Sequence, residues 1–394
     1  MDVVCFPFHD YKVALNEGFR TRDAHIYSSL EKLNYIDKVI IFNRPTLLLE
    51  KLLGKKTFET GGKVVHKSPL ITIQRFGENM FVVDCKDFSF LPPVLKGKAF
   101  IPSLYFKNRN NFKQALSIIG VNSFISYESS PLTRELVESL RPKAKVFDGV
   151  DNFCKHSTYR DMKSWLEVEY KKIINSYDAV YFNSKDSVNY FSASNNKNVT
   201  FLSNGVDFER FQGKYFQPSE MKVLQKRIGV YAGKMQSMFD IELVKQLALE
   251  HKDVDWVFLG KVLEGEIDTQ FDSFPNVYFF GDIHYESLPN YIKSADFCII
   301  PYLVEKQHGG DPIKFYEYYA SGAPIVSTPI GEIATYHDGI STFIVEKHEF
   351  SAAVNKIKNL TKVSNRVLPI DFTWRAKADL IFKPFNTVGD LSNH

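Results

Sequence analysis

The sequence predicts an α/β protein built from two doubly wound domains, and three observations lead to this fold class. Its 394 residues suffice for two or three domains at about 100–200 residues each. Short runs rich in Val, Ile and Phe alternate with longer amphipathic stretches along the whole chain. Apolar strands separated by helices indicate parallel sheets with both faces covered, because each connection must cross back over the sheet.

The elements follow in order along the chain. In the first half we expect strands near residues 2–6, 38–42, 70–75, 79–84, 122–127, 144–148 and 178–183, with helices near 22–35, 45–54, 108–119, 131–140, 158–176 and 184–194. In the second half we expect strands near 199–202, 227–232, 254–260, 276–281, 296–300, 324–328 and 342–345, with helices near 239–251, 285–294, 312–321, 349–360 and 373–383. No repeat of about 20–50 residues is visible, which argues against a solenoid.

This alternation divides into two units of similar size. We expect an N-terminal Rossmann-like domain over residues 1–198, a C-terminal one over 199–372, and a final helix in 373–394. Open α/β sheets bind ligands beyond the carboxyl ends of their strands, and two such domains face to face would enclose a cleft.

Charge and composition exclude several classes of protein. A net charge of +3 gives no overall field that would hold the chain on nucleic acid. The four cysteines are scattered without a C-x-x-C pair, so a zinc site or a disulfide framework is not expected. Asp2 follows Met1 directly and no basic region or long apolar stretch comes next, so we expect no signal peptide and a cytoplasmic protein.

The positive charge is concentrated in the first half, at 29 Lys/Arg against 21 Asp/Glu in residues 1–200. Residues 51–113 alone hold twelve Lys/Arg and four Asp/Glu, and residues 88–113 are also rich in aromatic residues and proline. Two interpretations remain open for residues 88–113. They form a solvated loop with a helix, or they form a patch that binds the inner face of the cytoplasmic membrane.

The best-known nucleotide and metal motifs are missing. There is no G-x-x-x-x-G-K-[ST], no G-x-G-x-x-G after a strand and no H-E-x-x-H. These absences argue against a P-loop ATPase, a standard NAD enzyme and a zinc hydrolase. We expect no metal and no cofactor.

Residues 307–328 carry the richest local signal. Asp311 is a good N-cap, Pro312 suits the first helical position, and Gly322 suits the end of the helix. Lys314 then lies in the first turn, where a cation and free N–H groups together suit an anion such as a diphosphate. Glu317 lies three residues on, where a carboxylate can accept hydrogen bonds from ribose hydroxyls.

Two arrangements of Lys314 and Glu317 fit this spacing. The two side chains pair with each other on a surface helix, or each faces a ligand. The helix is apolar nearly all round, so it should be buried, and buried charges need a partner such as a ligand. The setting therefore favours the second arrangement.

The same stretch resembles the "P-x-K-x-x-E-Y-x-A-x-G-x-P-V-V" block of GT-B glycosyltransferases, the family 4-like group. Other segments agree with that group in order and spacing: Ser203-Asn-Gly-Val-Asp-Phe-Glu-Arg-Phe211, Ile228-Gly-Val-Tyr-Ala-Gly-Lys234, Asn276-Val-Tyr-Phe-Phe-Gly-Asp-Ile, Leu288-Pro-Asn-Tyr-Ile-Lys-Ser-Ala-Asp-Phe-Cys-Ile-Ile-Pro301 and Thr373-Trp-Arg-Ala-Lys. The resemblance implies a GT-B fold, a nucleotide-sugar donor in the C-terminal domain, and a last helix that crosses back to the N-terminal domain. It implies that Gly233, Lys234 and Lys314 face the diphosphate, that Glu317 faces the ribose, and that Gly281, Asp282 and Ile283 lie near the base.

One departure from the family concerns its pair of glutamates. The first of that pair would fall at Gly309, so only Glu317 is present. Gly309 and Gly310 instead suggest a close approach of the backbone to the donor. In this respect the chain is similar to the teichuronic-acid and glucuronosyltransferase-like branch of bacterial polysaccharide biosynthesis.

The N-terminal domain carries the acceptor-side candidates. Asp148 and Asp151 follow a strand, where the resemblance places a general base, and Asp151 is the first choice. One of the two could instead cap the next helix. In the loop after the first strand, Gly18 could let the backbone approach the donor closely, and Arg20 or Arg22 could bind phosphate. A solvated loop is the alternative there.

The expected function is transfer of a sugar from a nucleotide-diphosphate sugar, UDP favoured, to a hydroxyl of a lipid-linked or cell-surface polysaccharide precursor. The expected partners are that donor, a glycan or polyprenyl-linked acceptor, and the membrane surface through residues 88–113, with no nucleic acid. A nucleotide-sugar epimerase and a two-lobed sugar-binding protein remain alternatives. Release of nucleotide diphosphate that depends on an acceptor separates the three.

Overall fold

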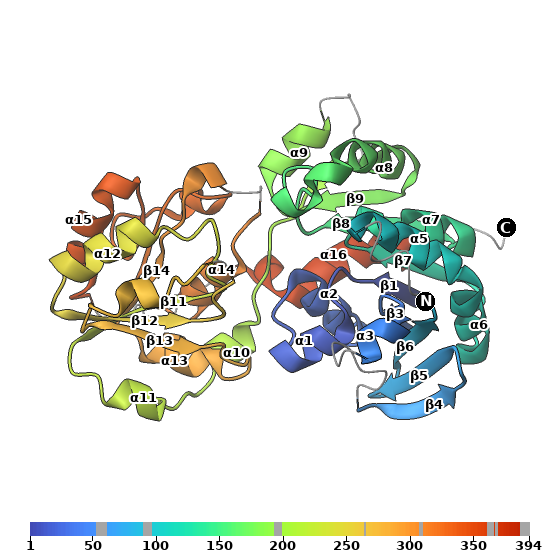
Figure 1. Cartoon of the computed structure of the whole chain (residues 1–394), viewed down its shortest axis with the longest axis horizontal. Helices are drawn as coiled ribbons and strands as arrows, with labels where there is room; N and C mark the ends of the chain where they lie inside the picture. The colour runs from blue at the N-terminus through green and yellow to red at the C-terminus, as the bar shows by residue number, and fades with distance from the viewer. Residues whose placement is uncertain are drawn as a thin grey trace. The chain divides into compact units, whose positions relative to one another are not determined.

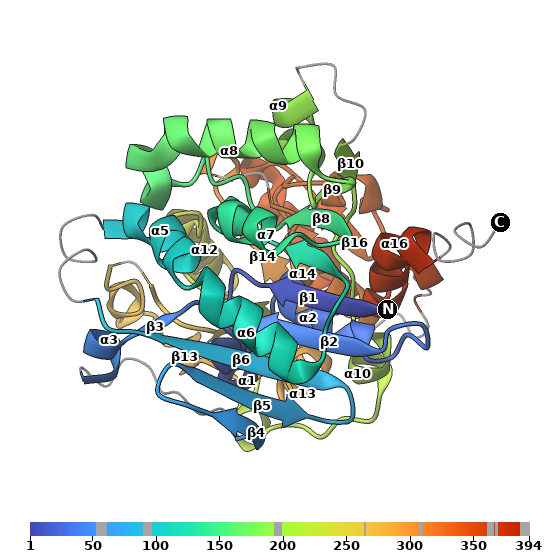
Figure 2. The same cartoon turned by 90° about the vertical axis from the view of Figure 1, so that its right-hand side faces the viewer.

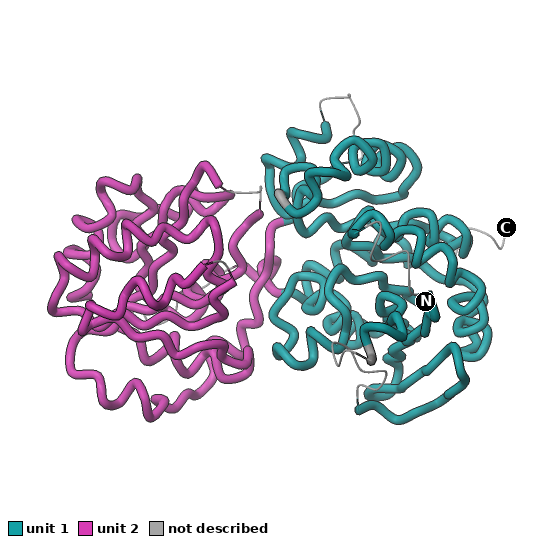
Figure 3. Tube along the Cα trace, in the orientation of Figure 1, with its two compact units in different colours: residues 1–202, 374–394 teal, residues 203–373 magenta. Residues whose placement is uncertain are grey.

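The structure is a computed structural model that describes residues 1–52, 61–89, 97–192, 199–263, 265–306, 310–360, 366 and 369–386. The chain forms two compact units, residues 1–202 with 374–394 and residues 203–373 (Figure 3). The predicted boundary at 198/199 therefore shifts by four residues. The reason is that Val199–Phe201 pairs in parallel with Ala179–Phe182 and so completes the sheet of unit 1.

Unit 1 contains a ten-stranded sheet (Figure 1). Its strands are β1 (Asp2–Phe6), β2 (Lys38–Phe42), β3 (Thr46–Leu47), β4 (Lys63–Lys67), β5 (Ile71–Phe76), β6 (Met80–Asp87), β7 (Phe124–Glu128), β8 (Ala144–Gly149), β9 (Ala179–Phe182) and β10 (Val199–Phe201). Its helices are α1 (Tyr11–Glu17), α2 (Arg22–Leu30), α3 (Leu48–Leu52), α5 (Phe100–Lys107), α6 (Arg109–Ile119), α7 (Arg134–Leu140), α8 (Lys163–Ser176), α9 (Lys185–Ser192) and α16 (Trp374–Asn386). The strand order is β10-β9-β8-β7-β1-β2-β6-β5-β4, and β3 pairs with β6.

Most of this sheet is parallel, as the sequence predicts, but its β4 edge is not. β5 pairs antiparallel with both β4 and β6. The connections explain this difference, because only residues 68–70 and 77–79 join these three strands. A parallel pair needs a crossover of about a dozen residues or more, and these links are far shorter.

Helices cover both faces of the unit 1 sheet. On one face α5, α6 and α7 pack against the central strands (Figure 2), through a core that includes Val4, Phe6, Ile40, Phe42, Tyr105, Phe112, Leu116, Leu136 and Val137. Elsewhere in the unit α16 packs against α2, where the Trp374 ring stacks on His25 with centroids 4.6 Å apart. The final helix therefore docks on the N-terminal domain, as the resemblance implies.

The basic aromatic segment is largely a core element rather than a surface patch. Phe100, Leu104, Tyr105 and Phe112 are buried, because α5 and α6 turn these side chains inward. Phe88 and Phe106 stay exposed, and residues 90–96 of the segment lie outside the described residues. Within the described part of the chain no helix is long and apolar enough to cross a membrane.

Unit 2 is built on a six-stranded parallel sheet of order β13-β12-β11-β14-β15-β16. Its strands are β11 (Arg227–Ala232), β12 (Val254–Leu259), β13 (Val277–Gly281), β14 (Phe297–Ile300), β15 (Ile325–Ser327) and β16 (Thr342–Ile344). Its helices are α10 (Phe208–Gln212), α11 (Ser219–Lys222), α12 (Ile241–Glu250), α13 (Leu288–Ser294), α14 (Ile313–Ala320) and α15 (Phe350–Ile357). Every strand predicted for this half is present, and all neighbours are parallel.

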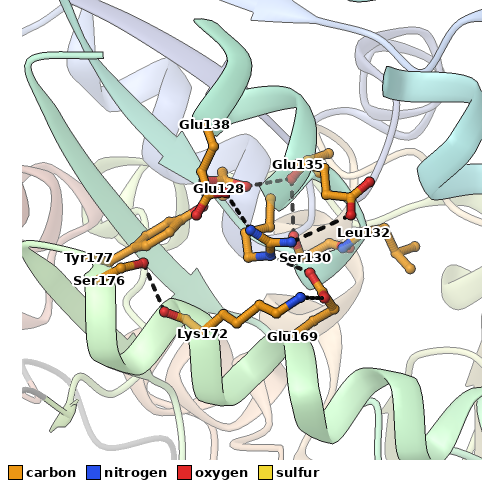
Figure 4. A network of polar contacts seen from close by, with 11 residues as sticks. Glu128, Ser130, Leu132, Glu135, Glu138, Glu169, Lys172, Ser176 and Tyr177 are labelled. Carbon is orange, nitrogen blue, oxygen red and sulfur yellow. Dashed lines mark hydrogen bonds and ion pairs between the residues drawn. The ribbon is translucent and has the colours of Figure 1, made fainter. Parts of the chain in front are cut away.

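A buried polar network joins β7, α7 and α8 in unit 1 (Figure 4). Glu128, the last residue of β7, accepts hydrogen bonds from Thr133 Oγ1 at 2.7 Å and from the Tyr177 hydroxyl at 2.5 Å. Arg134 binds Glu169 of α8, and Lys172 lies 2.9 Å from the same carboxylate. Burial raises the pKa of Glu128 to about 7, although its hydrogen bonds oppose the shift.

Glu128 therefore makes stability depend on pH. The folded state holds this proton up to pH about 7, whereas the unfolded chain releases it near 4.5, so the unfolding free energy falls as pH rises through this window. In denaturant titrations, the unfolding free energy of Glu128→Gln relative to wild type should be about 2–3 kcal/mol higher at pH 8 than at pH 5. Glu167→Gln on exposed α8 surface is the matched control. An equal difference from wild type at both pH values would contradict the buried, protonated Glu128.

Candidate functional site

The donor-side candidates gather at the carboxyl ends of two neighbouring strands in unit 2. β11 and β14 pair in parallel, so both chains leave the sheet at the same edge. Gly233 and Lys234 follow β11, and Tyr302 follows β14 after one proline. Ligand sites of open α/β sheets lie at this edge.

Lys314, in the first turn of α14, lies between two tyrosine rings. Its Nζ is 4.5 Å from the ring centroid of Tyr231 and 4.6 Å from that of Tyr302. It donates hydrogen bonds to both phenol oxygens, at 3.2 Å for Tyr231 and closer for Tyr302. Both tyrosines are buried, so these hydrogen bonds form in a setting of low dielectric, where they are electrostatically stronger than in water.

The ammonium group keeps its full charge for a ligand. Among the residues that the structure describes, no carboxylate forms an ion pair with Lys314, and Glu317 is not within ion-pair distance of it. This geometry excludes the arrangement in which the two side chains pair: the lysine binds two phenols, not the glutamate. A half-buried cation with neutral partners is suited to an anion such as a diphosphate.

Gly233 makes this placement of Lys314 possible. Its φ is +154°, a value that L side chains rarely adopt, and an added Cβ would lie 2.3 Å from Lys314 Nζ. Gly260 is similarly restricted, because its Cβ would lie 2.1 Å from the carbonyl oxygen of Gly233. Lys234 follows Gly233 and is half-exposed, and no described residue binds its ammonium group.

The start of α14 differs by one residue from the sequence prediction. Pro312 is the N-cap, and Asp311 precedes it with its carboxylate turned inward. That carboxylate accepts from the Tyr316 hydroxyl at 2.5 Å and from the Asn204 backbone N–H at 3.3 Å. Asp311 therefore fixes the loop before the helix instead of capping it. The helix end is as predicted, with Gly322 in the left-handed region at φ +76°.

The remaining donor-side candidates surround α14 less directly. Glu317 is buried. Burial of the Tyr285 phenol raises its pKa well above the usual value, and the charge of the nearby Glu317 is the next largest cause. Gly281 ends β13 with φ +73°, and Asp282 beyond it forms a 3.1 Å ion pair with Lys261. Ile283 packs at the margin of the core, Gly310 is half-exposed before α14, and Gly309 lies outside the described residues.

On the acceptor side, Asp148 and Arg22 bind each other. Arg22 Nη2 lies 2.8 Å from the Asp148 carboxylate, its Nε donates at 2.9 Å, and the Tyr127 hydroxyl donates at 2.7 Å. Both charged side chains are buried. Asp148 is therefore a poor base and Arg22 a poor phosphate ligand, because each is already neutralised in the core.

Asp151 is placed differently, at the carboxyl edge of the sheet beyond β8. No described residue forms a hydrogen bond or ion pair with its carboxylate, and the side chain is half-exposed. Burial raises its pKa to about 6; the nearby His9 opposes the shift, and Asp23 adds to it. His9 in turn lies 3.3 Å from Asp23, whose own pKa falls to about 2. A carboxylate with free lone pairs and such a pKa is suited to accept a proton near neutral pH.

Gly18 and Arg20 have structural explanations. Residues 11–17 form α1 where the sequence suggested a loop, and Gly18 ends this helix with φ +80°. Arg20 Nε donates to Glu17 at 2.8 Å, which ties it to the last turn of the same helix. The left-handed helix end accounts for the glycine without a donor.

Sequence reasoning missed four residues of these clusters: His9, Asp23, Tyr231 and Tyr302. A signal existed for the tyrosines, because both lie near the carboxyl ends of predicted strands. Tyr231 is two residues before Gly233, and Tyr302 is two residues after the strand expected at 296–300. It becomes visible only once β11 and β14 are known to be neighbours. For His9 the sequence offered only its place in the loop after the first strand, and for Asp23 only its place in the first turn of the next helix.

Residues 228–362 match the sequence profile of the family described as "Glycosyl transferases group 1". Part of the chain resembles a protein of Bacillus subtilis (strain 168), named as the teichuronic acid biosynthesis glycosyltransferase TuaH. The two are 28% identical over 136 residues, which cover 33% of this chain and 34% of that relative.

Solved structures resemble the whole chain. Sucrose-phosphate synthase from Thermosynechococcus elongatus has a TM-score of 0.70 at 13% identity, with 100% of both chains covered. HepE from Anabaena, in complex with UDP-glucose, has a TM-score of 0.61 at 12% identity, covering 98% of this chain and 100% of that one. The E. coli trehalose-6-phosphate structure, bound with UDP-2-fluoro glucose, has a TM-score of 0.61 at 12% identity and covers 100% and 99%. The chain therefore has the GT-B fold, and its match to the glycosyl transferases group 1 profile lies within unit 2.

Proposed function

We propose that the chain is a glycosyltransferase that uses a nucleoside diphosphate sugar as donor, with UDP as the favoured nucleotide. The single observation that carries this proposal is the Lys314 ammonium group, held between two phenols without a carboxylate partner among the described residues. This cation lies at the carboxyl edge of the unit 2 sheet, where such folds bind ligands. The named UDP complexes of HepE, which share the fold, support the choice of nucleotide.

In this proposal unit 2 stabilises the leaving diphosphate. Lys314 and Lys234 supply positive charge, Gly233 leaves room for the Lys314 ammonium group, and the bare backbone at Gly310 admits the phosphates closely. Glu317, buried within α14, accepts from the ribose hydroxyls. The transition state builds negative charge on the diphosphate, and the lysines offset it, so we propose that the reaction needs no divalent metal.

Unit 1 supplies the base for the acceptor in the same proposal. Asp151 takes the proton of the attacking acceptor hydroxyl. At the same time the oxygen of that hydroxyl bonds to the anomeric carbon, and the bond from that carbon to the diphosphate oxygen breaks. The products are the glycosylated acceptor and the nucleoside diphosphate. The name of the Bacillus subtilis relative points to a cell-surface polysaccharide precursor as the acceptor.

We place the protein at the inner face of the cytoplasmic membrane, where a lipid-linked precursor would be presented. Lys98, Lys107 and Lys113 are exposed on one stretch of unit 1, and the exposed Phe106 lies beside Lys107. Cationic side chains with an exposed ring suit a surface of anionic lipid. With most aromatic side chains of this stretch buried, the electrostatic part of the attraction would dominate.

Lys314→Ala tests the donor site. A thermal-shift panel of UDP- and GDP-sugars first identifies the donor, since ligand at 100 times its Kd adds about 2.7 kcal/mol of stability. The substitution removes a charge-assisted hydrogen bond of about 1.5–3 kcal/mol, so donor affinity should fall about 10- to 150-fold. Lys245→Ala on α12 is the control and should bind donor normally. Unchanged binding and turnover in Lys314→Ala would refute the donor-site assignment.

Asp151→Asn tests the base. With a pKa of about 6, Asp151 is protonated at acid pH, so kcat/KM of the wild type should rise as pH increases through about 6. The substitution should lower turnover about 10²- to 10⁴-fold and remove this acid limb. Turnover is followed as nucleoside diphosphate release with and without a membrane lipid extract as the source of acceptor.

Asp161→Asn, an exposed aspartate ten residues along, is the matched control for this experiment. Rearrangement of the donor sugar without an acceptor and without net release of nucleoside diphosphate would instead indicate an epimerase. Donor binding with neither release nor rearrangement would indicate a sugar-binding protein. Full activity in Asp151→Asn would leave the transferase in place and remove Asp151 from its role as base.

A further inference from the structure

The Tyr231 and Tyr302 hydroxyls form a small hydrogen-bond chain around Lys314. Tyr231 donates to the Lys234 carbonyl oxygen at 2.8 Å, and its oxygen lies 3.2 Å from the Tyr302 hydroxyl. Since the Tyr231 proton is used on that carbonyl, Tyr302 donates to Tyr231. Both phenol oxygens then accept from Lys314 Nζ, so one chain links Lys314 with the turn that carries Lys234.

Tyr231 remains neutral in this arrangement. Burial is the main cause that raises the pKa of Tyr231 well above its usual value, and the neighbouring Tyr302 is the second. Neutral oxygens can hold an ammonium group without cancelling its charge, as a carboxylate would. A lysine side chain also has up to about 2 kcal/mol of rotamer entropy to lose, so fixing it beforehand favours ligand binding.

On this geometry we propose that Tyr231 and Tyr302 are positioning residues, which orient the Lys314 ammonium toward the diphosphate of a nucleoside diphosphate and leave its charge unpaired. The inference rests on the proposed donor site and deepens it. It predicts preference for a diphosphate over a monophosphate, because the shorter ligand has no second phosphate to meet this cation. Tyr302 is the better probe, because its hydroxyl bonds only Lys314 and Tyr231 among the described residues.

A double-mutant cycle on the full chain tests the inference by isothermal titration in EDTA. The variants are Tyr302→Phe, Lys314→Met and the combination, and the probes are UDP and UMP, with GDP and ADP added to identify the base. Tyr302→Phe should weaken UDP binding about 5- to 20-fold and UMP binding less than about 2-fold. In the Lys314→Met background the same change should have almost no effect on UDP binding, because the phenol acts through the lysine.

Tyr291→Phe is the matched control, since it removes a phenol hydrogen bond to Glu220 elsewhere in unit 2. The melting temperatures of the variants show whether any loss reflects unfolding instead. A Tyr302→Phe effect that is absent, or equally large without the lysine, would overturn this inference and leave the donor site intact. A wild type that binds none of the nucleoside diphosphates would overturn the proposed function, and this inference with it.

Discussion

The donor half of the protein depends on one close approach, between Gly233 and the ammonium group of Lys314. A side chain at Gly233 would occupy the space of that ammonium group, and a side chain at Gly260 would collide with the Gly233 carbonyl. The two glycines therefore let the turns after β11 and β12 approach each other closely beside the Lys314 ammonium group. With this space open, the lysine reaches the phenols of Tyr231 and Tyr302 instead of extending into water.

Unit 1 shows how two neighbouring carboxylates acquire different chemistry. Asp148 is still within β8 and is fully buried with an arginine and a tyrosine, so its lone pairs are used inside the core. Asp151 lies three residues on, at the edge of the sheet, where burial raises its pKa and no described residue binds it. Near pH 6–7 a carboxylate of this kind is ionised in large part and still basic enough to accept a proton.

Much of the fold was predictable because its signals are local. The strands of unit 2 are continuous apolar runs, and the end of α14 follows from Gly322, a residue suited to a left-handed helix end. The sequence did not predict the antiparallel edge in unit 1, because a short apolar run looks the same whether its strand pairs parallel or antiparallel. Helix α1 is only seven residues long, too short to give a clear period.

The site was predictable only in part, because its decisive contacts join distant positions. Lys314 and Glu317 stand out through their spacing on one helix, but whether they pair depends on Tyr231, 83 residues away in sequence. The sequence alone does not distinguish the chemistry of Asp148 from that of Asp151. Arg22, which binds Asp148, lies 126 residues from it in the sequence. Such partners are determined by strand order, which a single sequence does not encode locally.

A crystal structure of the chain with UDP in EDTA tests the central claim most directly, namely that the diphosphate is bound by a lysine held between two phenols. The account predicts a diphosphate oxygen at about 2.7–2.9 Å from Lys314 Nζ, with the Tyr231 and Tyr302 hydroxyls still bonded to the same nitrogen. A diphosphate bound elsewhere, or a Lys314 that leaves the phenols to pair with Glu317, would contradict it.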